Sequence, residues 1–345
     1  MVIGDGAYFM YEADLCQAFK QIGYKNTTLF AYEKYLQDTK FARGEYLKSI
    51  SYKIQNKFSV GRGVSLLIKE ILHQCKKENP ELVFLYRCRA VVPRTVKEIK
   101  KMGITVFSYN NDNPFSEYYP KFFWRHYKNC IQLCDLNYVY RKSNIADCEQ
   151  YKSKRTEILR SYYLEQENYP LPEKEKLDNI PEVLFLGHCE EDYRKEYIEA
   201  LAENGIRVGV PSGWRGKVSN KNIVFLDNAG TQYNELINSA KIALVFLSTL
   251  NKDTYTRRCF EIPATKTMML SIYTEDLAGM FTPGKEAVYF NTKDELINKV
   301  KYYLIHDEKR EKIGLAGHDR LKNNGHEVKD RARQIINDYK NIHEK

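Results

Sequence analysis

The chain has 345 residues, of which 43% are hydrophobic and 29% charged, and its 54 basic and 45 acidic side chains give a formal net charge of +9. This composition is too apolar for a disordered chain and too polar for a membrane-embedded one. At about 150 residues per domain, the length suggests two domains, each able to bury a core without a disulfide or a metal. No signal-peptide pattern or long apolar run is visible, so we expect a cytoplasmic protein.

Eight cysteines are scattered along the chain without a Cys-x-x-Cys pair. Cys130 and Cys134 lie one helical turn apart, but no histidine pair accompanies them at the spacing of zinc ligands. We therefore expect reduced, mostly buried thiols and no structural metal.

The first half of the chain alternates between strand and helix patterns. An apolar run at residues 2–3 leads into a glycine-flanked turn and then an amphipathic stretch at 11–21. Later elements of the same kind are strands at 82–86, 104–109 and 136–140 and a helix at 93–102. Alternation at this spacing is typical of βαβ units, so we predict a parallel sheet.

The second half repeats this scheme. Strands are expected at 183–186, 207–210, 223–226, 242–247 and 268–272, and helices at 193–204, at 232–240 and from 294 onward. Between the halves, Pro170, Pro172 and the charge run at 173–176 indicate an interdomain linker. The predicted organisation is a first domain over 1–165, a linker over 166–180, a second domain over 181–325 and a C-terminal helix over 326–345 that packs back on the first domain.

Two doubly wound domains facing each other predict a ligand cleft between them. In open parallel sheets, ligands bind beyond the carboxyl ends of the strands. Functional residues are therefore expected in the loops that follow the strands, at 4–8, 87–90, 110–115, 187–194, 211–217, 227–233 and 248–262.

The most specific segment is Thr-Arg-Arg-Cys-Phe-Glu-Ile-Pro-Ala at residues 256–264. It precedes the strand pattern at 268–272, and it is followed by Asp-Glu-Leu at 294–296 and Ala-Gly-His-Asp-Arg at 316–320. Over roughly 183–335, this order of blocks resembles the C-terminal glycosyltransferase domain of the spore-maturation CgeB-like proteins. The first half matches that family in layout and in blocks such as Tyr109–Phe115.

The resemblance implies an α/β GT-B fold, in which two Rossmann-like doubly wound domains face each other across a cleft and the second binds most of a nucleotide sugar. It implies no cofactor and no metal, and the sequence lacks the Asp-x-Asp motif of the metal-dependent GT-A class. One departure is Thr265-Lys266-Thr267, where the family usually has glycines close to the donor. Lys266 could instead meet a donor phosphate.

Two acids define the expected donor side. Asp253 stands eight positions before Glu261, and retaining GT-B enzymes related to family 4 commonly carry Glu-x7-Glu at this spacing. By that resemblance, Glu261 accepts hydrogen bonds from the donor ribose, whose vicinal hydroxyls suit a carboxylate, and Asp253 lies near the transferred sugar as a catalytic group. The alternatives are a helix-start acid for Glu261 and a solvated loop acid for Asp253.

Arg257 and Arg258 lie between these two acids in the sequence, just before the predicted helix. Guanidinium groups stabilise the charge of a departing diphosphate without proton transfer, and a surface ion pair is the alternative. In the loop at 187–194, Gly187 and Arg194 are candidate donor-binding residues. His188 is either a catalytic group or an ordinary structural histidine.

Recognition of the base is expected near residues 227–233. Tyr233 could pack on the base, or it could be a core residue at the start of a helix. Nothing in the sequence distinguishes uracil from guanine or thymine.

The first domain is expected to supply the acceptor side. Asp5 and Tyr8 lie in the turn after the first strand, and Asp112 follows a later strand. Asp112 could orient a sugar hydroxyl as a catalytic group, or it could simply serve the turn. Arg87 and Arg89 follow the strand at 82–86 and indicate an anionic acceptor or a donor phosphate.

Residues 40–69 hold seven basic side chains against one acid, Glu45, interleaved with apolar residues. Such a segment is either a solvated helix face with its apolar stripe in the core or a face that contacts anionic lipid at the inner face of the membrane. No nucleic-acid-binding module is visible, so we expect no nucleic-acid partner.

The leading prediction is a retaining, metal-independent glycosyltransferase. It would move a sugar from a nucleotide sugar to a glycan or lipid-linked acceptor in bacterial surface polysaccharide synthesis. A sugar-nucleotide 2-epimerase and a non-catalytic glycan-binding or coat-assembly protein on the same scaffold are the alternatives.

Overall fold

The computed structural model describes residues 1–4, 6, 9–32, 54–55 and 57–344. Asp5, Tyr8 and half of the basic segment at 40–69 (residues 40–53 and 56) therefore lie outside the described residues. The chain divides into two compact units, one of Met1–Arg160 with Val328–Lys345 and one of Ser161–Glu327.

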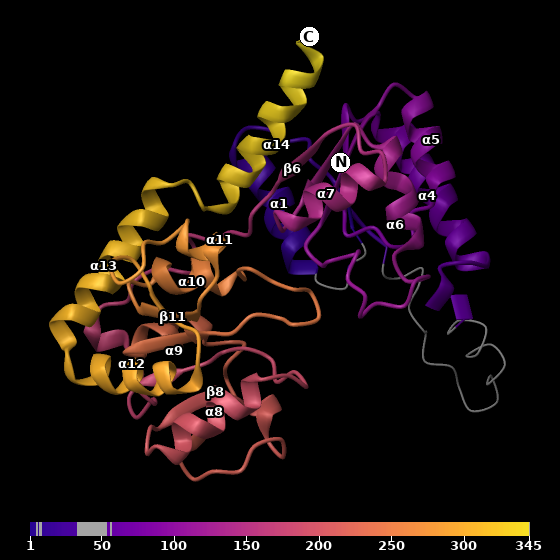
Figure 1. Ribbon diagram of the computed structural model, residues 1–345. Helices are drawn as coiled ribbons and strands as arrows, with labels where there is room; N and C mark the ends of the chain where they lie inside the picture. The colour runs from indigo at the N-terminus through magenta and orange to yellow at the C-terminus, as the bar shows by residue number, and fades with distance from the viewer. Residues whose placement is uncertain (5, 7–8, 33–53, 56, 345) are drawn as a thin grey trace. The chain divides into compact units, whose positions relative to one another are not determined.

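The first unit is built on a six-stranded parallel sheet (Figure 1), with the strand order β2-β1-β3-β4-β5-β6. Its strands are β1 (Val2–Gly4), β2 (Leu29–Ala31), β3 (Leu82–Tyr86), β4 (Thr105–Asn110), β5 (Leu136–Val139) and β6 (Thr156–Ile158). Its α-helices are α1 (Phe9–Gln21), α4 (Arg62–Glu78), α5 (Pro93–Lys101), α6 (Arg125–Cys130), α7 (Ser143–Gln150) and α14 (Val328–His343).

The second unit repeats this construction with the strand order β12-β11-β10-β7-β8-β9, again parallel throughout. Its strands are β7 (Val183–Leu184), β8 (Val208–Pro211), β9 (Ile223–Leu226), β10 (Ile242–Val245), β11 (Met268–Ile272) and β12 (Val288–Phe290). Its α-helices are α8 (Arg194–Glu203), α9 (Tyr233–Ser239), α10 (Arg258–Ala264), α11 (Glu275–Ala278), α12 (Lys293–Ile305) and α13 (Asp307–Asn323). Two doubly wound parallel sheets confirm the predicted fold class.

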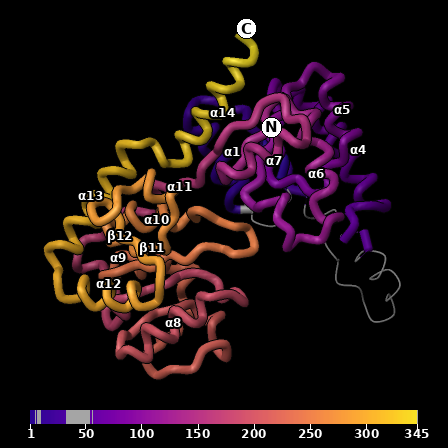
Figure 2. Tube along the Cα trace, viewed as in Figure 1, coloured from indigo at the N-terminus to yellow at the C-terminus, as the bar shows by residue number. Residues whose placement is uncertain are grey.

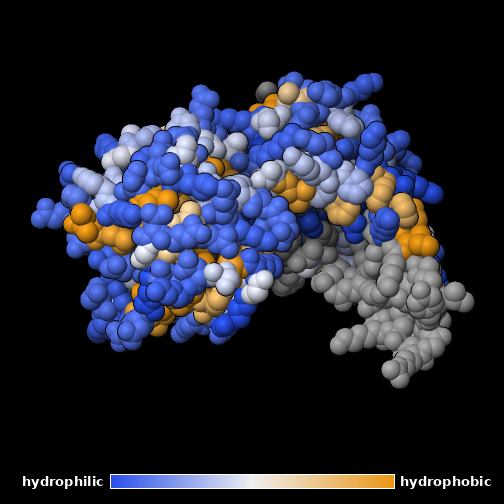
Figure 3. All heavy atoms as spheres, turned by 60° about the horizontal axis from the view of Figure 1, so that its bottom comes forward, coloured by the Kyte–Doolittle hydropathy of each residue, from blue (hydrophilic) through white to orange (hydrophobic). Residues whose placement is uncertain are grey.

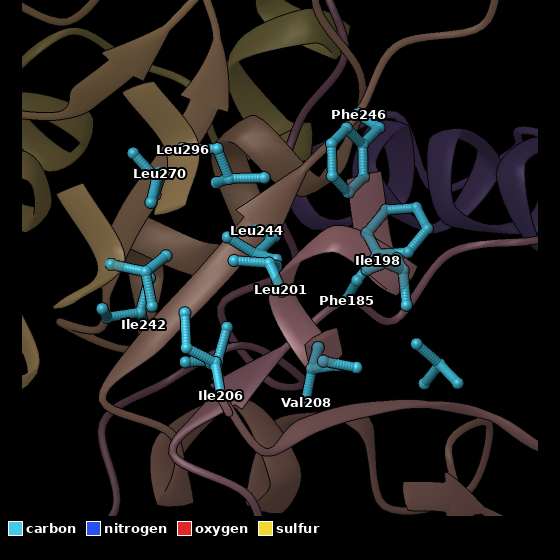
Figure 4. Close-up of a cluster of buried hydrophobic side chains, with 14 of the residues drawn as sticks. Phe185, Ile198, Leu201, Ile206, Val208, Ile242, Leu244, Phe246, Leu270 and Leu296 are labelled. Carbon is cyan, nitrogen blue, oxygen red and sulfur yellow. The ribbon is translucent and has the colours of Figure 1, made fainter. Parts of the chain in front are cut away.

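The core of the second unit shows why these segments fold together. Phe185 and Phe246, which follow β7 and β10, pack edge-to-face with ring centroids 4.9 Å apart. Figure 4 shows them beside Ile198 and Leu201 of α8 and aliphatic residues of β10 and β11. Burying such side chains completely stabilises a fold by about 1.5–3 kcal/mol each. The central strands read as apolar runs because both of their faces are covered.

Three strands escaped the sequence prediction: β2, β6 and β12. Each is only three residues long and lies at the end of its sheet. All residues of β2 and β6 are half-buried rather than buried, so neither shows the apolar run of a central strand. The helical part of the chain expected from 294 onward consists of α12, α13 and α14, with breaks at His306 and at residues 324–327, and α14 corresponds to the C-terminal helix expected over 326–345.

The last helix, α14, packs in the first unit. Tyr138 of β5 donates its hydroxyl to Asp338 of α14 at 2.6 Å, and Arg155 pairs with the same carboxylate at 2.7 Å. In the second unit, the proline-containing segment at 169–177 runs along α9. The backbone amides of Tyr169 and Leu171 donate to Asn234 and Asn238 of that helix.

Candidate functional site

The richest cluster of predicted residues lies at the carboxyl edge of the second sheet, where the loop after β10 leads into α10. This loop is held in place by side chains. Thr254 Oγ1 donates to Asp276 at 2.9 Å, Thr274 Oγ1 donates to the Thr254 carbonyl at 2.6 Å, and the Asp253 amide donates to the Ser248 carbonyl at 3.0 Å. A loop fixed in this way presents the residues that follow it in a defined geometry.

Arg257 and Glu261 form an ion pair on the first turn of α10. Arg257 Nε lies 2.7 Å from Glu261 Oε1, and the two side chains are 11% and 14% exposed. The Arg257 guanidinium also lies over the ring of Tyr162, 4.8 Å from its centroid. The pair is thus partly desolvated and oriented by an aromatic surface, which strengthens its electrostatic interactions.

Arg258 connects α10 to the end of β7. Its Nε donates to the Leu186 carbonyl at 3.0 Å, and its guanidinium lies 5.7 Å from the centroid of Phe185. The two consecutive arginines therefore point to different partners, and both remain at the carboxyl edge of the sheet.

Tyr233, at the start of α9, belongs to the same cluster. Burial raises the pKa of its phenol well above the usual range, and the neighbouring Glu261 carboxylate raises it further, while Arg258 and Arg257 act in the opposite direction. The Tyr233 phenol therefore lies within electrostatic reach of the three charged side chains. The structure brings together Tyr233, Arg257, Arg258 and Glu261.

Cys259, which lies between Asp253 and Glu261 in the sequence, is buried. Burial raises the pKa of the Cys259 thiol to about 12, and both carboxylates contribute to the increase. Both acids therefore act electrostatically on the same buried thiol. A thiol with this pKa stays protonated at neutral pH, so Cys259 is a packing residue here.

The loop after β7 holds three further predicted residues. Gly187 is buried, and a Cβ on it would lie 2.3 Å from the Phe185 ring, so only glycine fits. His188 is exposed, and its carbonyl accepts from Arg194 Nη1 at 3.2 Å. Arg194 is 4% exposed, and its guanidinium also lies 2.9 Å from Glu190 and 3.3 Å from Asp192. In this conformation Arg194 orders the loop.

Lys266 is not part of this cluster. It lies just before β11, at the amino edge of the sheet, in a left-handed conformation with φ 65°. Its neighbours Thr265 and Thr267 are buried and hydrogen-bonded to each other at 3.0 Å. These threonines close the turn between α10 and β11.

The first unit carries a second set of charged residues at the carboxyl edge of its sheet. Arg87, after β3, pairs with Asp112, after β4, with Nε 2.7 Å from Oδ2. Arg87 adopts φ 52°, a strained backbone conformation for a long side chain, and such strain is commonly found at functional positions. Arg89 lies over the ring of Phe123, 4.6 Å from its centroid.

Sequence reasoning missed two members of this edge. Glu12 of α1 is 1% exposed and accepts from the Gly6 amide at 3.1 Å. A Cβ at Gly4 would lie 2.1 Å from the Glu12 carboxyl carbon, so this glycine makes room for the buried acid. Arg141, after β5, is 1% exposed and donates to the Asn111 carbonyl at 3.1 Å. Gly4 at the end of the first strand is visible in the sequence, but it does not identify Glu12 as its buried neighbour.

Across the described ranges, no three or more histidine, cysteine, aspartate or glutamate side chains are grouped so that they could hold a metal ion. None of the helices in that part of the chain has the length and apolar character needed to cross a bilayer.

Comparison with known families gives one match, to a family described as glycosyl transferase-like, over residues 194–337. This range contains Tyr233, Arg257, Arg258 and Glu261. No curated protein matches the sequence.

Solved structures resemble the chain from end to end. Sucrose-phosphate synthase from Thermosynechococcus elongatus is 12% identical, with a TM-score of 0.69 and 99% of each chain covered. Anabaena HepE in complex with UDP-glucose is 11% identical, with a TM-score of 0.68 and 99% of each chain covered. A glycosyltransferase from Rickettsia africae is 15% identical, with a TM-score of 0.68, and 99% of this chain and 98% of that one are covered. Residues 194–337 are therefore glycosyl transferase-like, and the whole chain has the fold of the GT-B glycosyltransferases.

Proposed function

We propose that the protein is a glycosyltransferase that moves a sugar from a nucleotide sugar to a glycan or lipid-linked acceptor. The observation that carries this proposal is the cluster of Tyr233, Arg257, Arg258 and Glu261 at the carboxyl edge of the second sheet. Open α/β sheets bind their ligands at this edge.

The cluster suits a nucleoside diphosphate. The two arginines supply fixed positive charge for the phosphates, and the Glu261 carboxylate can accept hydrogen bonds from both ribose hydroxyls. In the transfer, the bond between the sugar and the diphosphate breaks and a bond to an acceptor hydroxyl forms, with loss of the hydroxyl proton. The arginines stabilise the negative charge that develops on the departing diphosphate.

The reaction proposed for this site is retaining and needs no divalent cation. The acid pair Asp253 and Glu261 at the expected spacing supports the first point, and the two arginines, which can take the role of a metal on the diphosphate, support the second. Arg87, Asp112 and Arg141 in the first unit are proposed to bind and orient the acceptor. The acceptor belongs to a bacterial surface glycan, in keeping with the CgeB-like resemblance of the sequence.

The test is a panel of sugar nucleotides, incubated with the full chain, with release of nucleoside diphosphate as the readout. UDP-glucose is the first donor to use, because HepE was solved with it. We expect release of UDP or of another nucleoside diphosphate, unchanged by a chelator. Binding without release would favour the non-catalytic alternative, and conversion of the sugar without release would favour an epimerase.

A further inference from the structure

The exposed side of α4 is a line of basic residues. Its buried face consists of Val64, Leu67, Ile71 and Cys75. The opposite face carries Arg62, Leu66, Lys69, His73, Lys76 and Lys77, all exposed. These positions recur every three or four residues, so they form one stripe along the helix.

The neighbouring helix α5 extends this stripe into a wider surface. Figures 1 and 2 draw α4 and α5 side by side, in agreement with their residue contacts. Arg94, Lys97 and Lys101 of α5 are exposed. The ammonium of Lys101, which donates to Glu98, holds the pKa of that carboxyl below its usual range, with smaller contributions from Arg94 and from Lys76 of α4. The charged groups of the two helices therefore act on the same carboxylate.

We define the basic face as the exposed cations of both helices, Arg62, Lys69, Lys76, Lys77, Arg94, Lys97 and Lys101. Three carboxylates lie on the same two helices, Glu70, Glu78 and Glu98. Glu98 pairs with Lys101 at 2.9 Å, and Glu70 accepts from Gln74 at 2.6 Å. The basic face thus keeps a clear excess of positive charge.

Aliphatic side chains stand at one end of the basic face. Ile54, Val60 and Leu66 are 49%, 42% and 47% exposed. Gln55 ties this part of the chain to the start of α4, because its Oε1 accepts from the Gly63 amide at 2.7 Å and its carbonyl accepts from the Val60 amide at 3.3 Å. On the face drawn in Figure 3, hydrophilic side chains predominate and hydrophobic ones gather in small groups.

We infer that the basic face, with Ile54, Val60 and Leu66, docks on a membrane surface that contains anionic lipid. Lysine and arginine attract anionic headgroups. Exposed aliphatic side chains lose contact with water when they enter the boundary between the headgroups and the acyl chains, and this burial strengthens binding. A nucleic acid would use the cations, but single strands are bound by stacking of their bases on aromatic side chains, and the three exposed residues here are aliphatic. The inference does not depend on sugar transfer, because it rests on a surface and not on the site in the second unit.

The test is cosedimentation of the full chain with vesicles of phosphatidylcholine, with and without phosphatidylglycerol. We expect binding to the anionic vesicles only, and weaker binding at high salt because surface charges are screened. Each basic residue near such a surface strengthens binding about fivefold, so removal of three should weaken it about a hundredfold. The variant is Lys69→Gln, Lys76→Gln and Lys97→Gln combined.

A matched control removes three exposed lysines of the second unit, Lys221→Gln, Lys285→Gln and Lys312→Gln. It should bind vesicles as the natural chain does. Circular dichroism confirms that both variants are folded. An equal loss in the control, or equal binding to neutral vesicles, would overturn the inference.

Substitution of the aliphatic residues distinguishes binding to a membrane from binding to a nucleic acid. Ile54→Ser with Leu66→Ser should weaken binding to anionic vesicles severalfold while all charges remain. The inference would be contradicted if the natural chain did not bind vesicles and bound a single-stranded RNA tightly, with the RNA binding unchanged in the variant. That outcome would assign the basic face to RNA.

Discussion

At the carboxyl edge of the second sheet, Arg257, Arg258 and Glu261 come from one short stretch of chain. At the same edge of the first sheet, Arg87, Asp112 and Arg141 come from the ends of three different strands. The two sheets share a parallel, doubly wound construction, so the backbone does not account for the difference. It lies in how the functional groups are distributed along the sequence.

This difference explains which half of the molecule can be recognised. A contiguous segment such as 256–264 keeps its spacing when sequences diverge, and the glycosyl transferase-like match covers it. Residues scattered over several loops leave no fixed spacing to detect. Substitutions at each edge would show whether the two edges differ in chemistry as they differ in layout.

The largest effect is expected from Arg257→Ala combined with Arg258→Ala. Loss of one group that stabilises charge in the transition state costs about a hundredfold to a thousandfold in turnover, and we expect at least that. Release of nucleoside diphosphate measures turnover, and calorimetry measures nucleoside monophosphate binding, which should weaken less. The matched control is Arg207→Ala, an exposed arginine just before β8 at the amino edge of the same sheet. Unchanged turnover in the double variant would remove the arginines from the reaction.

A second prediction concerns stability and should affect the first unit alone. Asp338→Ala leaves the buried Tyr138 hydroxyl and Arg155 without their shared acceptor. Breaking a partly buried pair of this kind costs about 2–4 kcal/mol. Hydrogen exchange should show faster opening of α14 and β5, while β10, β11 and nucleotide affinity stay unchanged. Asp330→Ala on the same helix removes a more exposed pair with Arg333 and should cost less than about 1 kcal/mol.

The sequence predicts the central strands of both sheets because their runs of buried apolar residues are long enough to recognise. It does not predict β2, β6 and β12, which are short strands at the ends of their sheets. The cluster on α10 was predictable because Arg257, Arg258 and Glu261 are close in sequence. Glu12 and Arg141 were not, because a buried charge is identified by its tertiary neighbours and both residues read as ordinary surface charges.

A third prediction separates a ribose contact at Glu261 from a purely structural role. Glu261→Gln keeps the size of the side chain but removes its charge, and it also breaks the pair with Arg257. Affinity for a ribonucleoside diphosphate should fall by about 1.5–3 kcal/mol, the range of a hydrogen bond to a charged group. The loss should be smaller for the 2′-deoxy compound, which offers one hydroxyl fewer. Calorimetry with both nucleotides tests this, and equal losses together with a lower melting temperature would contradict the ribose role.

The smallest effect is expected at Cys189, in the loop after β7. It is half-buried, whereas the other seven cysteines are buried. Burial raises the pKa of the Cys189 thiol. Because the thiolate is the reactive form, the thiolate fraction and the alkylation rate should keep increasing as the pH rises above the usual range of thiol pKa values. Mass spectrometry after brief iodoacetamide treatment should find Cys189 modified first. Cys134, Cys148 and Cys259, whose pKa values burial raises to about 12, should react only after unfolding.

The same thiol reports on the edge of the second sheet. If a nucleoside diphosphate binds at Arg258 and the loop after β7, it should slow alkylation of Cys189 about twofold to tenfold, as expected for partial loss of access. A nucleotide that leaves this rate unchanged while it binds would place the donor elsewhere. Labelling of the unfolded chain, where access is complete, provides the reference rate. Because Cys189 belongs to the second unit, a ligand that binds only in the first unit should leave its alkylation rate unchanged. The alkylation rate of Cys189 therefore assigns each ligand to one of the two units.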